Sequence, residues 1–87
     1  MLARELAPRG IRVNAVSPGP TETSFFARTG MSEEAIGQLA QSILSQVPPG
    51  RFGSADEIAA VAAFLLSREA SFVTGSEYVV DGGISEL

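Results

Sequence analysis

The chain has 87 residues, a formal net charge of −4 and 45% hydrophobic residues, which suits one small globular domain and argues against disorder. It has neither cysteine nor histidine, which excludes disulfides, a thiolate nucleophile and the commonest general base and metal ligand. Its positive charge comes from six scattered arginines, whereas phosphate binding requires clustered positive charge. We therefore expect no metal site and no nucleic-acid partner.

No apolar run approaches the roughly 18 residues that a membrane-spanning helix requires. The scattered positive charge also disfavours binding to an anionic membrane surface. Residues 1–10 include Arg4, Glu5 and Arg9 and lack the apolar segment of a signal peptide. We therefore expect a cytoplasmic protein that makes no membrane contact.

The first elements are expected to be a short helix and a strand. Met1–Ala7 combines leucines and alanines that favour a helix, and Pro8-Arg9-Gly10 is expected to end it. Because isolated helices below about 12 residues are marginal, this stretch indicates either the end of a longer helix or a frayed N-terminal turn. Ile11–Ser17 alternates with period two and is rich in β-branched residues, which predicts a strand. Pro18-Gly19-Pro20 is expected to end that strand.

The middle of the chain is expected to form a loop followed by a helix. Thr21–Met31 shows no clear period and predicts a loop, with room for a short helical turn at Ser24–Arg28. Ser32 is a suitable N-cap, and two glutamates follow in the first turn, where the helix dipole favours anions. Apolar residues then recur at helical spacing up to Pro48-Pro49-Gly50, which is expected to end the helix. The apolar face consists of Ile36, Leu39, Ala40, Ile43, Leu44 and Val47.

A second helix is predicted from Ser54-Ala55-Asp56-Glu57, which has the capping-box pattern of a serine followed three residues later by a glutamate. The sequence that follows, EIAAVAAFLLS, is apolar nearly all the way round. We therefore expect this helix to be buried on several sides, against a sheet and against another subunit. Val73–Ser76 is then expected to be a turn, Glu77–Asp81 a second strand and residues 84–87 a short tail.

The predicted order of strand, helix, helix and strand indicates an α/β fold with two parallel strands and intervening helices. Parallel sheets usually have both faces covered, and this chain can cover little more than one face. A partner chain or a further part of the fold is therefore expected to complete the sheet.

Three sequence blocks resemble the last third of the classical short-chain dehydrogenase/reductase family, in the same order and with ordinary spacing. They are LARELAPRGIRVNAVSPG, RFGSADEIAAVAAFLLS and VTGSEYVVDGG, and they cover residues 2–19 and 51–83. The segment 20–50 matches the variable substrate-side region of that family. The resemblance implies that residues 1–87 form a single partial domain, the C-terminal piece of a doubly wound, Rossmann-type parallel sheet.

In that family the turn that matches Pro18 and Gly19 closes over the nicotinamide ring of NAD or NADP. Thr21 matches the position whose main-chain N–H and C=O groups hold the carboxamide, and Thr23 matches a threonine whose hydroxyl bonds the carboxamide or phosphate. The resemblance thus implies that these four residues bind the cofactor. The setting is consistent, because ligands in open α/β sheets bind beyond the carboxyl ends of the strands. Taken without the resemblance, the same residues indicate a strand end and a solvated loop.

The resemblance also indicates which chemistry the chain lacks. The family uses a tyrosine as general acid/base, a lysine four residues later, an upstream serine and a glycine-rich turn for the pyrophosphate. This chain has no lysine, and its only tyrosine, Tyr78, falls in the last predicted strand. The family's tyrosine and lysine would fall shortly before Met1. We therefore assign no catalytic residue, and we give Asn14, which matches the asparagine of an Arg-Val-Asn stretch, no catalytic role.

Two acidic pairs, Glu33-Glu34 and Asp56-Glu57, have the residue types of acid/base or metal sites. Both lie in the first turns of predicted helices, where capping and the helix dipole account for them. We therefore assign them a structural role.

The resemblance implies an NAD- or NADP-dependent oxidoreductase that transfers hydride between the nicotinamide and a carbonyl or alcohol, and this piece of it is expected to be inactive alone. An oligomerisation module and a truncated remnant without function stay open as alternatives. The family commonly forms a two-fold interface through its last long helix and strand. A homo-oligomer, or pairing with a related subunit, is therefore implied through Ser54–Ser67 and Glu77–Asp81. Neither the substrate nor the choice between NAD and NADP follows from the sequence.

Overall fold

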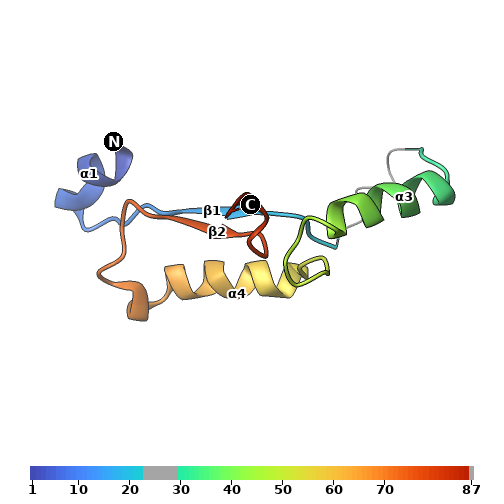
Figure 1. The fold of residues 1–87 in the computed structure, drawn as a ribbon. Coiled ribbons are helices and arrows are strands. Elements are labelled where there is room, and N and C mark those ends of the chain that lie inside the picture. The colour runs from blue at the N-terminus through green and yellow to red at the C-terminus, as the bar shows by residue number, and fades with distance from the viewer. Residues whose placement is uncertain (23–29, 87) are drawn as a thin grey trace.

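The computed structural model describes residues 1–22 and 30–86 and confirms the predicted order of strand, helix, helix and strand (Figure 1). The expected helical turn at Ser24–Arg28 lies outside the described residues. The elements in chain order are α1 (Leu2–Leu6), the 3₁₀ helix η1 (Ala7–Arg9), β1 (Ala15–Pro18), α3 (Glu33–Leu44), α4 (Ala55–Leu66), the 3₁₀ helix η2 (Arg68–Ala70), β2 (Glu77–Val80) and the 3₁₀ helix η3 (Ile84–Glu86).

The predicted N-terminal helix is present, and the expected stop at Pro8-Arg9-Gly10 takes the form of a 3₁₀ turn that Gly10 ends. α1 ends at Leu6 and the chain continues as η1, with Pro8 in the first turn, where its missing N–H needs no partner. Gly10 then ends the helical stretch with a φ of 73°, a left-handed conformation that glycine adopts readily.

β1 begins four residues later than predicted and includes Pro18. Ala15 and Gly19 donate their N–H groups to the carbonyls of Ser76 and Val80, at 2.9 and 3.0 Å. Alternate residues therefore face β2, and Pro18 lies between two of them with its nitrogen at the free edge, where no N–H is required. The expectation that Pro18 lies outside the strand is wrong for this reason.

Side chains and one backbone hydrogen bond, from the Gly75 N–H to the Val13 carbonyl at 2.7 Å, join the residues before β1 to the turn before β2. The Asn14 side chain donates from Nδ2 to the Val73 carbonyl at 2.9 Å and accepts at Oδ1 from the Ser76 N–H at 3.0 Å. The Arg12 guanidinium donates to the same Val73 carbonyl and to that of Ser67, at 3.1 and 3.3 Å. The strand predicted here is therefore regular only in its second half.

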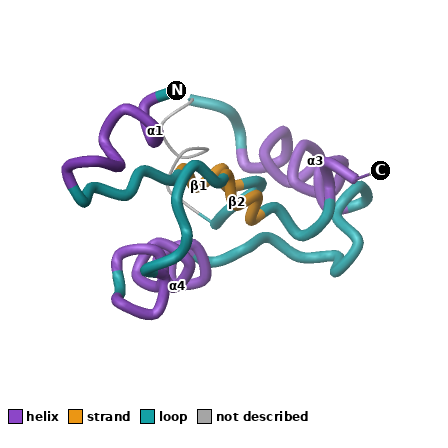
Figure 2. The backbone as a smooth tube through the Cα atoms, turned by 90° about the vertical axis from the view of Figure 1, so that its left-hand side faces the viewer, coloured by secondary structure: helices purple, strands orange, loops and turns teal. Residues whose placement is uncertain are grey.

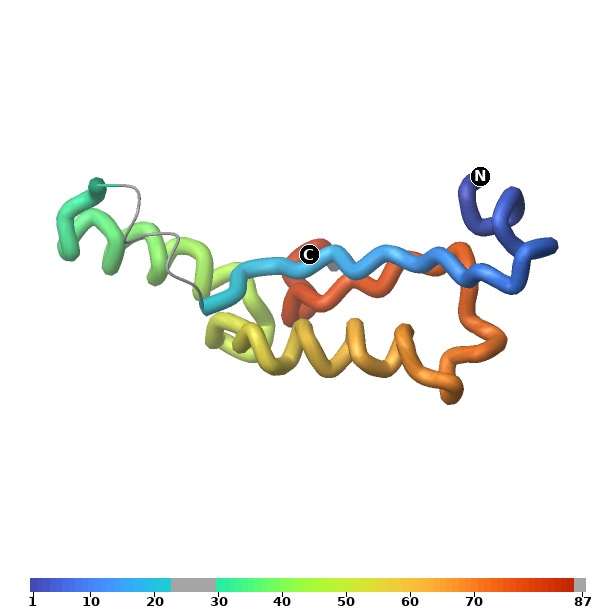
Figure 3. The backbone as a smooth tube through the Cα atoms, turned by 180° about the vertical axis from the view of Figure 1, so that it is seen from behind, coloured from blue at the N-terminus to red at the C-terminus, as the bar shows by residue number. Residues whose placement is uncertain are grey.

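β1 and β2 form the predicted parallel pair, in register from Ala15 with Glu77 to Pro18 with Val80. α4 covers one face of this pair, below the strands in Figures 1 and 3. α1 lies on the opposite side, near the amino ends of the strands, as the view along the strands in Figure 2 also shows. The second face is largely open, since Val79, which alternation directs away from α4, is 52% exposed.

The two long helices begin where the sequence predicts. Ser32 caps α3 by accepting from the N–H of Ala35 at 3.1 Å, and Ser54 caps α4 within the predicted capping box. α3 ends at Leu44 and does not reach Val47, because the residue before a proline is disfavoured in helical conformation. Val47 is instead buried beside the turn that follows β2.

The chain buries little of its apolar surface. Among the described residues only Ala3, Val47, Leu65 and Ala70 are buried, and no large side chain is fully buried. The exposed surface is 6480 Å², whereas folded monomers of this mass expose about 4,900 Å². The radius of gyration is 16.5 Å, against about 12 Å for a compact chain of this length. The chain is therefore more extended and more exposed than a compact monomer of its mass.

In the single chain α4 is buried on one side, against the sheet, and its expected contact with another subunit stays a prediction. Leu65 is buried, but its neighbours Phe64 and Leu66 are 40% and 85% exposed. α4 packs against β1 with one face only. Contacts among the described residues therefore leave the apolar character of its outer face unaccounted for.

Candidate functional site

The candidate site begins at the turn after β1, beside the carboxyl ends of both strands. The backbone of Gly19 runs so close to Asp81 that an added Cβ would lie 2.6 Å from the Asp81 Cα. Only glycine fits here without a backbone shift, so Gly19 sets the spacing between the two strand ends. Thr21 closes the turn by donating from Oγ1 to the Gly19 carbonyl at 2.8 Å.

Beyond this turn the chain pairs with the segment before α4. Gly53 donates its N–H to the Pro20 carbonyl at 3.0 Å, and its carbonyl accepts from the Glu22 N–H at 2.8 Å. Thr21 and Gly53 thereby form a parallel bridge. Since successive peptide groups of an extended chain alternate in direction, the N–H and C=O of Thr21 point away from Gly53. The outer side of the turn thus presents one amide donor and one carbonyl acceptor.

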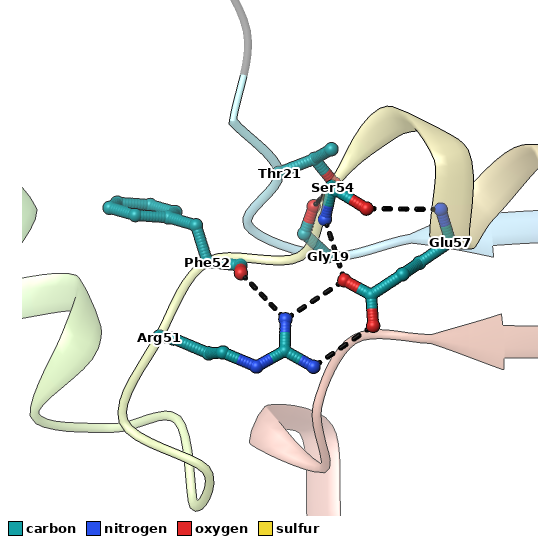
Figure 4. Close-up of polar contacts among 6 residues, drawn as sticks. All are labelled: Gly19, Thr21, Arg51, Phe52, Ser54 and Glu57. Atoms are coloured by element: carbon teal, nitrogen blue, oxygen red, sulfur yellow. Dashed lines mark hydrogen bonds and ion pairs between the residues drawn. The ribbon is translucent and has the colours of Figure 1, made fainter.

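The Glu57 carboxylate, at the start of α4, orders the segment that precedes this helix (Figure 4). Glu57 accepts two parallel hydrogen bonds from the Arg51 guanidinium, at 2.8 and 2.9 Å, and a third from the Ser54 N–H at 2.9 Å. Arg51 also donates to the Phe52 carbonyl at 3.1 Å. The bonds from Arg51, and then that from Ser54, lower the pKa of Glu57 to about 2. In return, Glu57 raises the pKa of Arg51.

Asp81 organises the turn after β2. Its carboxylate accepts from the Gly83 N–H at 2.8 Å and from the Ser85 N–H at 3.2 Å. These bonds from Ser85 and Gly83 hold the pKa of Asp81 below its ordinary value. The side chain of Asp81 therefore orders its own turn, while its backbone lies against Gly19.

A cavity of about 80 Å³ lies where these segments meet. Its lining consists of Pro20, Val47, Pro49, Arg51, Gly53, Glu57, Ile58, Val80, Asp81 and Gly82. Pockets for organic ligands usually measure about 300–1,000 Å³, so this cavity is too small to hold a nicotinamide dinucleotide. The groups that could meet a cofactor are instead those on the outer side of the turn.

The structure brings together three of the four residues that the sequence assigns to cofactor binding. Pro18 is the last residue of β1, and Gly19 and Thr21 follow it in the turn, so the three lie together at the carboxyl ends of the strands. Thr23 lies outside the described residues. Tyr78 lies in β2 as predicted, half-buried and away from this turn.

Sequence reasoning misses the second half of the site. It gives Gly53 and Asp81 no role at this site, although Gly53 directly precedes the capping box and Asp81 ends the last predicted strand. It assigns Glu57 to helix capping alone. The structure confirms that cap and adds the ion pair with Arg51.

Within the described ranges, no group of three or more histidine, cysteine, aspartate or glutamate side chains could hold a metal ion. Across the same ranges, every helix is too short or too polar to cross a bilayer. What the structure assembles is a set of backbone groups braced by one ion pair, which suits binding and orientation.

Comparison with known proteins identifies the family. Residues 1–85 match the family model described as enoyl-(acyl carrier protein) reductase. The 3-oxoacyl-(acyl-carrier-protein) reductase FabG of Salmonella typhimurium is 48% identical over 83 residues, which are 95% of this chain. A short chain dehydrogenase from Bacillus anthracis matches 97% of the chain in three dimensions, with a TM-score of 0.76 and 41% identity. The chain belongs to the short-chain dehydrogenase/reductase family.

Other members of the short-chain dehydrogenase/reductase family match nearly the whole chain. A protein of Xanthobacter autotrophicus named inactive 2-(S)-hydroxypropyl-CoM dehydrogenase 2 is 41% identical over 99% of the chain. The structure of a putative 2-deoxy-D-gluconate 3-dehydrogenase from Agrobacterium tumefaciens with bound NADP also covers 99% of it, with a TM-score of 0.85 and 38% identity. The chain spans only about a third of these proteins: 32% of FabG, 37% of the Xanthobacter protein, and 31% and 33% of the two solved chains.

Proposed function

We propose that this chain supplies the nicotinamide-side turn and the last two strands of an NAD- or NADP-dependent oxidoreductase. Pro18, Gly19, Thr21 and Thr23 would contact the cofactor. The observation that carries this proposal is the outward direction of the Thr21 peptide groups, at a turn beside the carboxyl ends of two parallel strands.

The chemistry of the turn fits a carboxamide. A nicotinamide carboxamide has one carbonyl acceptor and one NH₂ donor, and Thr21 offers the complementary N–H and C=O from a single residue. Because the close contact between Gly19 and Asp81 and the bridge to Gly53 fix the backbone, little conformational entropy remains to be lost on binding. When bound, the nicotinamide carries the hydride, and the turn orients the face of the ring.

The relatives support the cofactor class. The Agrobacterium protein was solved with bound NADP, and a further structural relative, YwfH, is described as an NADPH-dependent reductase. YwfH matches 95% of this chain, with a TM-score of 0.81 and 38% identity.

We further propose that the chain alone does not catalyse hydride transfer. It has no lysine, and its single tyrosine, Tyr78, is half-buried in β2, in register with Val16. Acid/base catalysis by a positioned side chain contributes about 10²–10⁴-fold, so a chain without that pair is not expected to turn over.

The test is a fluorescence titration of the purified chain with reduced nicotinamide mononucleotide, NADH and NADPH. We expect a weak, saturable change with all three, because the chain holds the nicotinamide end only. Gln38→Ala, on the exposed side of α3 and outside the turn, is the control, and we expect it to bind as the parent does. Absence of any change contradicts cofactor binding and favours a remnant without function. Saturable turnover of a ketone contradicts the proposed inactivity.

A second candidate function is self-association through α4 and β2, over Ser54–Ser67 and Glu77–Asp81. Its support is the apolar outer face of α4 and the exposed Val79 of β2. The exposed surface exceeds that of a compact monomer by about 1,600 Å². Each partner of a standard interface buries about 800 Å², so the excess is large enough for a two-fold contact.

Sedimentation velocity tests this candidate. We expect a dimer at micromolar concentration that Leu66→Glu dissociates, because that side chain lies on the outer face of α4 and is 85% exposed. Leu39→Glu on α3 is the matched control, as it adds the same charge to another exposed leucine outside the proposed interface. A monomeric parent chain, or equal dissociation by both substitutions, contradicts this interface.

A further inference from the structure

The segment 51–54 connects the start of α4 to the turn after β1. The guanidinium of Arg51 holds one end of it, through the bidentate pair with Glu57. At the other end, the Ser54 N–H donates to the same carboxylate. Gly53 lies between these two anchors and makes both backbone hydrogen bonds to the turn.

Little else fixes this segment. Phe52, Gly53 and Ser54 are half-buried, and the few fully buried side chains lie in other segments. The pair of Arg51 and Glu57 is also the only ion pair between side chains of the described residues. Polar contacts rather than apolar packing therefore determine where Gly53 lies.

We propose that Arg51 and Glu57 are positioning residues for the cofactor-facing turn: their ion pair holds Gly53 in place and thereby sets the direction of the Thr21 peptide groups. The inference rests on the proposed function for its link to the cofactor. Neither side chain contacts the cofactor itself. A bidentate pair of arginine and carboxylate suits this role, because its two parallel hydrogen bonds fix orientation as well as distance.

A role confined to helix capping predicts a different result. Glutamine completes a capping box as glutamate does, so Glu57→Gln would leave α4 and the turn unchanged if capping were its only role. If Glu57 positions the turn, the same substitution keeps the cap, breaks the ion pair and loosens the turn. Glu57→Gln thus separates the two roles.

The experiment is site-resolved amide hydrogen exchange by NMR on the full 87-residue chain. We expect Glu57→Gln and Arg51→Met to speed exchange of the Gly53 and Glu22 amides by about two- to fivefold, the range of an exposed ion pair. Arg51→Lys should have a smaller effect, because lysine keeps the positive charge and loses only the two parallel hydrogen bonds of the guanidinium. The amide of Val61, in the middle of α4, serves as the internal reference.

Asp56→Asn is the matched control, since it removes the same charge from the same helical turn, and Asp56 makes no side-chain hydrogen bond within the described residues. Equal exchange at Gly53 and Glu22 in Glu57→Gln and Asp56→Asn overturns the positioning role. A change that spreads equally to Val61 also overturns it, because that result indicates loss of the helix.

Titration with reduced nicotinamide mononucleotide separates this inference from the proposed function. If the parent chain binds and Glu57→Gln binds several-fold more weakly, both are supported. If both chains bind equally although exchange has changed, the positioning role towards the cofactor is overturned. If the parent chain does not bind, the proposed function fails, and with it the link from Glu57 to the cofactor, while the exchange data still decide whether the pair holds the turn.

Discussion

The two ends of the sheet are held together in different ways. At the carboxyl ends, Gly19, Gly53 and Asp81 make close backbone contacts, and an ion pair braces them. Towards the amino ends, large apolar side chains lie in solvent: Leu66 is 85% exposed and Phe72 is fully exposed. Hydrogen bonds order both ends, but the amino end also carries apolar surface without a cover.

This difference follows from what each kind of interaction requires. A hydrogen bond needs only two groups at the right distance, so a two-stranded piece can complete a turn by itself. Apolar stabilisation grows with the area removed from water, and two strands with one covering helix remove little. A piece of a larger fold can therefore keep a well-defined turn while it lacks a core.

Among substitutions at the carboxyl ends of the strands, Gly19→Ala should have the largest effect, because the added Cβ falls at the closest backbone contact there. The added Cβ would lie 2.6 Å from the Asp81 Cα, so one strand end must move. We expect a loss of about 1–3 kcal/mol in the free energy of unfolding, measured by chemical denaturation. Gly37→Ala is the control, because that position in α3 has open space around it and should gain about 0.5–1 kcal/mol. Equal effects of the two substitutions would refute the close contact.

Asn14→Ala tests whether the amino end has any order of its own. Its side chain bonds both the Val73 carbonyl and the Ser76 N–H, so its loss leaves the part-buried Ser76 N–H without a partner and the Val73 carbonyl with the Arg12 guanidinium alone. We expect a cost of about 1–3 kcal/mol and faster exchange at Ser76. Gln38→Ala, on the exposed side of α3, should change neither quantity. Unchanged exchange at Ser76 would show that the backbone ladder holds this turn without Asn14.

Lowering the pH should weaken the ion pair of Arg51 and Glu57 and so loosen the turn at the carboxyl ends of the strands. The pKa of Glu57 lies at about 2 in the folded chain, whereas the ordinary value of 4.5 applies when the chain is unfolded. The unfolded chain therefore binds the proton more readily. The stabilisation by this carboxylate is therefore fully present above pH 4.5 and is lost as the pH falls through about 2. We expect the NMR shifts of the Gly53 amide to follow this titration. In Arg51→Met the midpoint should move up towards 4.5, and an unmoved midpoint would contradict the ion pair.

Elements with local causes could be predicted from the sequence. The capping box at Ser54 and the N-cap at Ser32 define helix starts through residues that are neighbours in the chain. The strand at Glu77–Val80 and its parallel partner follow from periodicity and from the helices between them. The turn at Gly19 to Thr21 could be placed as well, because it follows the first strand directly, although Pro18 itself belongs to that strand.

The features that the sequence did not predict depend on residues far apart in the chain. β1 starts late because Asn14 bonds a turn about sixty residues away, which no local period reveals. The bridge between Thr21 and Gly53 is equally non-local. For the outer face of α4, the composition predicts burial, and contacts among the described residues do not provide it, so a contact with another subunit stays a prediction.

Phe72→Ser should have the smallest effect, and it tests the other half of the comparison. Since the side chain is fully exposed, we expect a change of less than about 0.5 kcal/mol in the free energy of unfolding of the monomeric chain. Leu65→Ala, at a buried position, should cost about 2–5 kcal/mol in the same denaturation experiment. A large loss with Phe72→Ser would mean that this end of the molecule buries its apolar side chains in contacts of its own. The two ends of the sheet would then not differ in the way that their exposure indicates.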